Sequence, residues 1–257
     1  GGGDQQCAAL GLGAIDPGQA GLCLGTAAVL SCPVNHPVFD RANRFFCTAH
    51  VVPMRWVLEG IQNSFGGSIR WVRNMLGIIT GEAFQHLASR ACPGLERPLF
   101  LPFLAGIGSP DFDAHARAAL VGLDLAHTRA DLARAVLDGI ALEAARILDA
   151  MEAHVHARRL TVTGGESARR SGIQVLADLL GRRLRVNTTA DATLLGAAIL
   201  AWTGVGKFAN LREATRACVQ EPSAEIRPAM SASDRRALYR RYVRWVAAVR
   251  GAANSKG

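Results

Sequence analysis

The residues of this sequence with the clearest chemical potential are two adjacent glycines at the end of a short apolar run. Leu160 to Thr163 reads as a β-strand that continues directly into Gly164 and Gly165. Without a Cβ, such a pair lets the backbone approach a flat or charged ligand closely. The helix expected from about Ser171 would add free N–H groups that suit an anion. Taken alone, an ordinary strand-to-helix turn is the more common explanation.

A second glycine turn interrupts the apolar run over residues 21–31. There Gly25 is followed by Thr26, whose hydroxyl and neighbouring amides on a tight turn are able to hold a terminal phosphate. A two-residue pattern is a weak signal, and simple turn chemistry remains the alternative. The chain contains neither GxGxxG nor GxxxxGK[ST], the two glycine motifs most specific for phosphate.

One carboxylate follows the glycine run at the start of the chain. Asp4, next to Gln5, could accept the proton of a substrate hydroxyl while that oxygen attacks a phosphoryl group. The competing interpretation, of equal weight on local grounds, is that Asp4 caps the helix that follows.

Other common catalytic or metal-binding patterns are not evident. No Ser/His/Asp or Cys/His grouping stands out, and His154 and His156 lie two positions apart, on different faces of a helix. The six cysteines form no CxxC pair, and several sit in apolar runs, which favours buried, reduced thiols of a cytoplasmic protein. No protein metal site is predicted.

The elements that must position these residues follow an α/β order. A long amphipathic helix begins after Thr128, a plausible N-cap, and reaches about Ala157. The strand at 160–163, a helix at about 171–180, a strand at 184–187 and a helix at about 193–202 come next. This alternation predicts a sheet with helices on its faces.

The remaining segments are assigned from apolar periodicity. We expect a buried hairpin or strand and turn at 21–31, strands at 45–52 and 99–104, and helix from 56 to about 87, broken near 66–67 and 77. Residues 205–230 are predicted to be irregular, and residues 231–257 a terminal helix and tail.

The charge is strongly basic, and arginine supplies nearly all of it. The net charge is +8, with Lys207 and Lys256 as the only lysines. The densest arginines, at 235–244, recur at helical spacing and are interpreted as the solvated face of an amphipathic helix, not as a nucleic-acid patch. No apolar run is long enough to cross a membrane, so neither nucleic acid nor membrane is predicted as a partner.

Together these motifs resemble the FGGY family of carbohydrate kinases. Gly1 to Gln6 resembles the segment that carries the family's catalytic aspartate, and Leu24-Gly25-Thr26 its second phosphate motif. Phe100 to Gly106, followed by Ser109-Pro110, is similar to the family's FLPYLSGERTP-like stretch. Leu160 to Gly165 resembles the adenosine motif, and Leu195 to Ala198 the GAA motif that closes the nucleotide cleft.

The most specific part of the resemblance is the long second signature of the family. Its apolar, small and acidic positions are matched throughout by Ala118, Leu120, Gly122-Leu123, Asp131-Leu132, Ala135 to Leu137 and Asp138. The resemblance is collinear over about residues 1–205, which chance explains poorly.

The resemblance implies a fold, an activity and a set of site residues. The fold would be α/β, a ribonuclease H-like lobe of the actin and hexokinase type, with a mixed sheet and helices on both faces. Asp4 would be the general base and would contact the sugar together with Gln5. ATP, with Mg²⁺, would be bound by six residues: Gly25, Thr26, Gly164, Gly165, Glu166 and Ser167.

Two departures from the family pattern bear on activity. The usual Glu-Arg of the ERTP stretch is here Ile107-Gly108, which removes a polar contact. The third glycine of the common GGGA form is Glu166, followed by Ser167, which alters the adenine pocket.

The resemblance also implies that the chain is a fragment. We expect residues 1–257 to be the C-terminal nucleotide-binding lobe, inactive without an N-terminal lobe. The parent kinase is expected to phosphorylate a ketopentose such as xylulose. Glycerol or another polyol, and a non-catalytic nucleotide- or sugar-binding module, are the alternatives. Expected partners are ATP, a small sugar, the absent lobe and a second copy in a homodimer.

Overall fold

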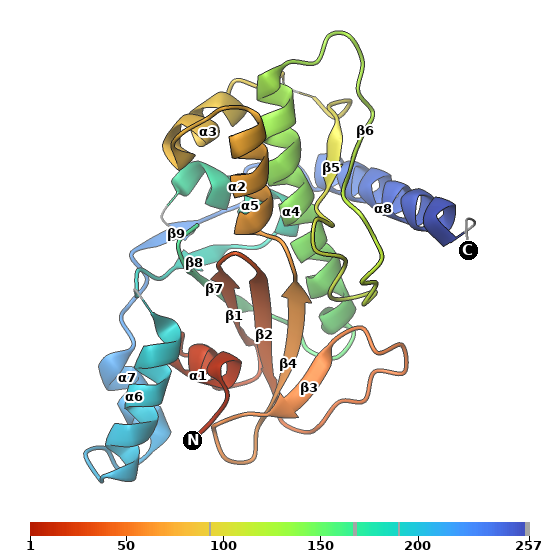
Figure 1. Cartoon of the computed structure of the whole chain (residues 1–257). Coiled ribbons are helices and arrows are strands. Elements are labelled where there is room, and N and C mark those ends of the chain that lie inside the picture. Colours follow the sequence, from red (N-terminus) through yellow and green to blue (C-terminus); the bar gives the residue numbers. More distant parts are fainter. Residues whose placement is uncertain (93, 167–168, 190, 255–257) are drawn as a thin grey trace.

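The computed structural model describes residues 1–92, 94–166, 169–189 and 191–254, with residues 252–254 described at the backbone only. Its centre is a mixed sheet of order β3-β4-β2-β1-β7-β8-β9 (Figure 1). These strands are β1 (Gln19–Leu24), β2 (Ala28–Val34), β3 (Phe46–Ala49), β4 (Trp56–Gln62), β7 (Arg159–Thr163), β8 (Leu184–Val186) and β9 (Ala224–Ile226). A separate antiparallel pair consists of β5 (Leu99–Leu101) and β6 (Ala119–Val121).

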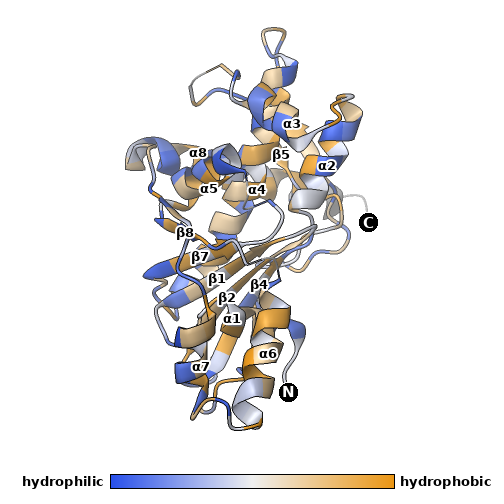
Figure 2. Cartoon of the chain, turned by 90° about the vertical axis from the view of Figure 1, so that its left-hand side faces the viewer, coloured by the Kyte–Doolittle hydropathy of each residue, from blue (hydrophilic) through white to orange (hydrophobic). Residues whose placement is uncertain are grey.

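Helices cover both faces of the sheet, so the α/β fold class predicted from the sequence is confirmed. One face carries α1 (Asp4–Gly11), α6 (Ala192–Gly204) and α7 (Leu211–Cys218). The helices on the other side are α2 (Gly66–Met75), α3 (Gly81–Ala88), α4 (Arg129–Glu152), α5 (Arg170–Leu180) and α8 (Ala232–Asn254). Figure 2 shows the sheet between α4 and α5 above and α1, α6 and α7 below.

The helix α4 supplies much of the main core, and its start is fixed by its sequence. Thr128 and Asp131 form a capping box, in which each side chain bonds the other residue's backbone amide. Buried apolar side chains of α4 then pack against β4, β5 and α5. The predicted N-cap is confirmed, and the helix ends at Glu152, before the predicted boundary near Ala157.

The parallel pairing of β1 with β7 and of β7 with β8 sets the direction of the site. Gln19 lies opposite Arg159, and Cys23 lies opposite Thr163. Both strands therefore end at the same edge of the sheet, where the glycine turns follow.

Two segments differ from the sequence-based expectation. Residues 56–62 were predicted to be helical but form β4, paired with β2 on one side and β3 on the other. Tertiary packing explains this: a Cβ at Gly60 would overlap the side chain of Ile147 on α4, so the strand is held against that helix. The segment 205–230, expected to be irregular, contains α7, whose N-cap Asn210 accepts a hydrogen bond from the Glu213 amide, and β9.

Candidate functional site

The two glycine turns singled out in the sequence meet in space. The Gly25-Thr26 turn leaves the end of β1, and Gly164-Gly165 leaves the end of β7, its parallel neighbour. Between them and α2 lies a cavity of about 320 Å³. We call this cavity the glycine pocket; it is lined by Leu24, Gly25, Thr26, Gly66, Ile69, Arg70, Arg73, Gly81, Gly165, Glu166 and Arg169.

The first turn is held in place by the start of α2. The amides of Gly66 and Gly67 donate to the carbonyls of Gly25 and Thr26, each at 3.0 Å, and the Phe65 amide donates to Thr26 at 2.9 Å. A Cβ at Gly66 would lie 2.6 Å from the Gly25 carbonyl oxygen, so this clamp needs glycine. The exposed Thr26 hydroxyl has no hydrogen-bond partner within the described ranges and remains available to a ligand.

The second turn uses its two glycines differently. Gly164 has φ +101°, and a Cβ there would overlap the backbone of Leu24, so this residue fits the turn against β1 only as glycine. Gly165 is exposed, and a Cβ there would meet no heavy atom within 4 Å. Because Gly165 lines the pocket, its missing side chain leaves room for a ligand.

Three arginines that the sequence reasoning missed give the pocket its charge. Arg70 and Arg73 come from α2, and neither forms an ion pair with any described residue. The Nε of Arg73 is buried and has no hydrogen-bond partner in the described part of the chain. Arg169 pairs with Glu166 at 3.0 Å. Three guanidinium groups against one carboxylate leave a positive pocket that suits a polyphosphate.

The spacing of two of these arginines was a usable signal. Arg70 and Arg73 are three residues apart on the helix that begins at the Gly66-Gly67 pair, so both side chains lie on one face of α2. The guanidinium of Arg169 also lies under α3, because a Cβ at Gly81 would approach its Nε to 2.5 Å.

The N-terminus of α5 lies beside the same turn. The helix starts at Arg170, and its N-cap residue, Arg169, forms no side-chain capping hydrogen bond. Such an N-terminus favours a negatively charged group. Ser167, expected to help bind ATP, lies outside the described residues.

Asp4 and Gln5 do not line the glycine pocket. Asp4 is the first residue of α1, and Gly3, not Asp4, occupies the N-cap. Its exposed carboxylate accepts a 2.9 Å hydrogen bond from the Gln5 amide. Asp4 therefore begins the helix without capping it, and its side chain is open to an incoming molecule.

The first turn of α1 is tied to the sheet by a buried polar group. Gln6 donates to Glu59 of β4 and to Thr48 of β3, and Thr48 donates to Glu59 at 2.7 Å. Glu59 is only 6% exposed, and the sequence reasoning did not identify it. This network fixes the direction of the helix end that carries Asp4.

The helix α6 holds the rest of α1. A Cβ at Gly196 would overlap the backbone of Cys7, and one at Gly11 would overlap the carbonyl of Ala192. The glycine of the predicted GAA motif, Leu195 to Ala198, thus lets two helices pack backbone to backbone. Its immediate effect is to position α1.

The acidic residues of the long signature stabilise α4. Asp138 is fully buried and forms ion pairs with Arg97 and Arg134. Asp131 accepts a 2.9 Å hydrogen bond from the backbone amide of Cys92. In the unusual Ile107-Gly108 pair, a Cβ at Gly108 would overlap the Ile61 carbonyl of β4. The backbone at Gly108 therefore packs closely against β4.

Several broader features concern only the described part of the chain. No helix there is long and apolar enough to span a membrane, and no group of three His, Cys, Asp or Glu side chains could hold a metal ion. All six cysteines are described and unpaired, as expected, but Cys92 is exposed, so the expectation of buried thiols is wrong at that position.

Comparison with protein families supports the reading of these motifs. The model of the FGGY family of carbohydrate kinases, C-terminal domain, matches residues 20–205. The glycerol kinase of Deinococcus radiodurans is 30% identical over 97% of this chain and 50% of its own length. That of Rhodopirellula baltica is 31% identical over 96% of this chain and 46% of its own. The chain thus spans about half the length of the curated relatives it matches.

Solved structures show the same fold. The ligand-bound xylulose kinase of Lactobacillus acidophilus superposes with a TM-score of 0.89 at 23% identity, covering 98% of this chain and 51% of that one. The glycerol kinase of Plasmodium falciparum with ADP gives a TM-score of 0.83 at 23% identity, covering 96% and 50%.

Proposed function

The chain belongs to the FGGY family of carbohydrate kinases, and we propose that it is the nucleotide-binding half of an enzyme that phosphorylates a sugar or polyol hydroxyl with ATP. The observation that carries the proposal is the glycine pocket. It combines an open hydroxyl on Thr26, a Cβ-free wall at Gly165 and a buried guanidinium nitrogen on Arg73 without a partner among the described residues.

We assign the two ends of the nucleotide to the two glycine turns. The hydroxyl and amide of Thr26, with Arg70 and Arg73 nearby, would hold the phosphates, because charged and polar donors favour anionic oxygens. Gly25, whose own amide donates to the Ala27 carbonyl, would let the phosphates approach its backbone. Gly164, Gly165 and Glu166 would lie beside the ribose and adenine, with Ser167 as a further proposed contact. Mg²⁺ would enter with the nucleotide, since this ion binds phosphate oxygens and keeps several waters.

Asp4 is proposed as the general base. An exposed carboxylate is able to accept the proton of the acceptor hydroxyl as its oxygen attacks the γ-phosphoryl group. The oxygen–phosphorus bond to the new acceptor forms, the bond to ADP breaks, and the proton passes to Asp4. Gln5 would contact the acceptor. The other half of the parent enzyme would close over both substrates and position them.

Two acceptors are proposed for testing. The relatives described above are glycerol kinases at 30% and 31% identity, which favours glycerol. The sequence motifs favoured a ketopentose such as xylulose, and the fold is shared with xylulose kinases. Both acceptors present a primary or secondary hydroxyl to the same base.

The experiment joins this chain to the N-terminal half of its parent protein and measures ADP release with glycerol, xylulose and other ketoses. We expect one acceptor to support turnover, and Asp4→Asn to lower kcat by about 10²–10⁴-fold, the usual contribution of general-base catalysis. Asp234→Asn, an exposed change in the first turn of α8, is the matched control. Turnover by Asp4→Asn at the wild-type rate would contradict the assignment. Nucleotide binding without turnover of any acceptor would instead favour a non-catalytic binding module.

A further inference from the structure

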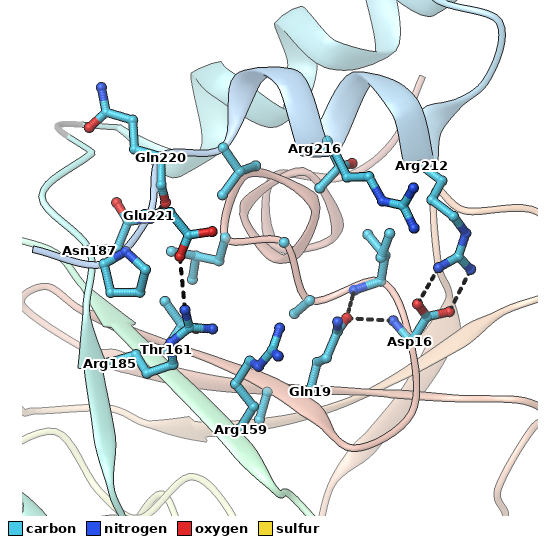
Figure 3. Close-up of a pocket in the computed structure, with 18 residues that line it drawn as sticks. Asp16, Gln19, Arg159, Thr161, Arg185, Asn187, Arg212, Arg216, Gln220 and Glu221 are labelled. Carbon is cyan, nitrogen blue, oxygen red and sulfur yellow. Dashed lines mark hydrogen bonds and ion pairs between the residues drawn. The ribbon is translucent and has the colours of Figure 1, made fainter. Parts of the chain in front are cut away.

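A second and larger cavity lies on the opposite face of the sheet, away from the glycine pocket. It has a volume of about 560 Å³ and is enclosed by the chain after α1, by α7, and by the first residues of β1 and β7 (Figure 3). We call it the α7 pocket. β7 contributes Arg159 and Thr161 to it, whereas the glycine pocket begins only after Thr163, at the other end of that strand.

The α7 pocket is rich in guanidinium groups. Four arginines line it, against two carboxylates. Arg212 forms a two-pronged ion pair with Asp16, at 2.6 and 2.8 Å, and Arg185 pairs with Glu221 at 3.1 Å. These two pairs account for both carboxylates.

The other two arginines have no such partner. Neither Arg159 nor Arg216 forms an ion pair or a side-chain hydrogen bond with any residue that the structure describes. In Figure 3 the guanidinium of Arg159 rises from the sheet and that of Arg216 comes down from α7. Two unpaired positive charges thus face one cavity from opposite walls.

Neutral donors complete the lining. The Oε1 atom of Gln19 accepts hydrogen bonds from the backbone amides of Ile15 and Asp16, each at 2.8 Å, which fixes that side chain. The NH₂ group of Gln19 has no acceptor among the described residues. Thr161 is 7% exposed, and its hydroxyl likewise has no partner in the described ranges. Arg185 also has a buried Nε that forms no hydrogen bond there, and that atom lies 3.9 Å from a carboxylate oxygen of Glu225. Such a lining suits a ligand with several acceptor oxygens.

We propose that the α7 pocket binds a small phosphate-bearing molecule. Arginine forks match the oxygens of phosphate in a bidentate manner, and the surplus of two positive charges fits a phosphate dianion or a phosphate ester. The site is separate from the glycine pocket, so the proposal stands whether or not that pocket binds ATP.

The test is calorimetric titration of this chain with pyrophosphate at constant ionic strength. Because Arg70 and Arg73 of the glycine pocket also attract phosphate, three double variants are compared: Arg159→Ala/Arg216→Ala, Arg70→Ala/Arg73→Ala, and Arg90→Ala/Arg236→Ala. The last removes two exposed arginines outside both pockets, so that all three lose the same charge.

We expect the first variant to lose one class of pyrophosphate sites, with binding there at least about tenfold weaker, the change of one lost charge-assisted contact. The second variant should keep that class, and the third should bind as the wild type does. Unchanged pyrophosphate affinity in the first variant would overturn the proposal. So would an equal loss of affinity in the third variant, because the binding would then depend only on the net charge of the protein.

Two further measurements secure the result. If the first variant fails to fold, as judged by circular dichroism, Thr161→Val replaces it, because this change of similar volume removes only the buried hydroxyl; retained affinity would then contradict the proposal. Titration with succinate separates phosphate recognition from general dianion binding. Succinate bound as tightly as pyrophosphate would refute the phosphate assignment.

Discussion

At the scale of single residues, the two glycines after β7 divide two tasks between them. Gly164 is required by the backbone, because its φ is +101° and a side chain would strike Leu24. Gly165 is free of both constraints and faces the glycine pocket. The fold therefore depends on the first glycine and the ligand on the second.

This division predicts stability effects of different size for the same substitution at the two glycines. Gly164→Ala should lower the free energy of unfolding by about 2–4 kcal/mol, from backbone strain and overlap together. Gly165→Ala should change it by less than about 1 kcal/mol. Urea denaturation measures both. Equal effects of the two substitutions would contradict the conclusion that only Gly164 is required by the backbone of this turn.

His50 predicts a dependence of stability on pH. Burial lowers the pKa of His50 below its ordinary value, while its Nε2 lies 2.9 Å from the Ala14 carbonyl oxygen. The unfolded chain then takes up a proton more readily than the folded one, so stability is present above about pH 6.5 and is lost as the pH falls below it.

The measurement is the urea midpoint at pH 7.5 and at pH 5.5. The wild type should lose more stability between these values than His50→Gln, with the exposed His36→Gln as control. If the His50→Gln variant lost as much stability between these pH values as the wild type, the pH dependence would come from other groups.

At the scale of elements, the contact between α1 and α6 connects Asp4, the proposed general base, with the rest of the fold. Gly196 has no room for a Cβ beside Cys7, whereas Gly204, at the end of the same helix, has no heavy atom within 4 Å of that position. The placement of Asp4 depends on this contact and on the Gln6–Glu59 bond at the start of α1.

We therefore expect Gly196→Ala to destabilise the protein by about 1–3 kcal/mol through overpacking. Gly204→Ala should be neutral or stabilising by up to about 1 kcal/mol, because alanine favours a helix. Thermal unfolding followed by circular dichroism compares the two variants. A neutral Gly196→Ala would mean that α1 is able to move away from α6 without loss.

The same elements show what sequence patterns are able to predict. The helix α4 was predicted because its N-cap Thr128 and its long apolar face are local signals. The strand β4 was missed because apolar spacing over seven residues does not separate a buried strand from a helix, and only pairing with β2 and β3 decides. The α7 helix was missed although its Asn210 cap is a local signal.

At the scale of the whole molecule, the parallel pairing of β1 and β7 brings the predicted glycine turns into one pocket. The sequence motifs were sufficient to predict Gly25, Thr26, Gly165 and Glu166 as neighbours. The pocket arginines were not predicted. The spacing of Arg70 and Arg73 places both on one face of α2, but the direction of that face depends on how α2 is clamped to the Gly25-Thr26 turn. The α7 pocket likewise combines segments about 200 residues apart, such as Asp16 and Arg212.

The most direct test of the account is calorimetric titration of this chain with ADP. We expect saturable binding with one site in the glycine pocket, weakened at least about tenfold by Gly165→Val, whose side chain would occupy the ligand's space without disturbing the fold. Gly204→Val, in open space outside the pocket, is the matched control and should bind as the wild type does. A folded Gly165→Val variant with unchanged ADP affinity would contradict the assignment of the glycine pocket to the nucleotide.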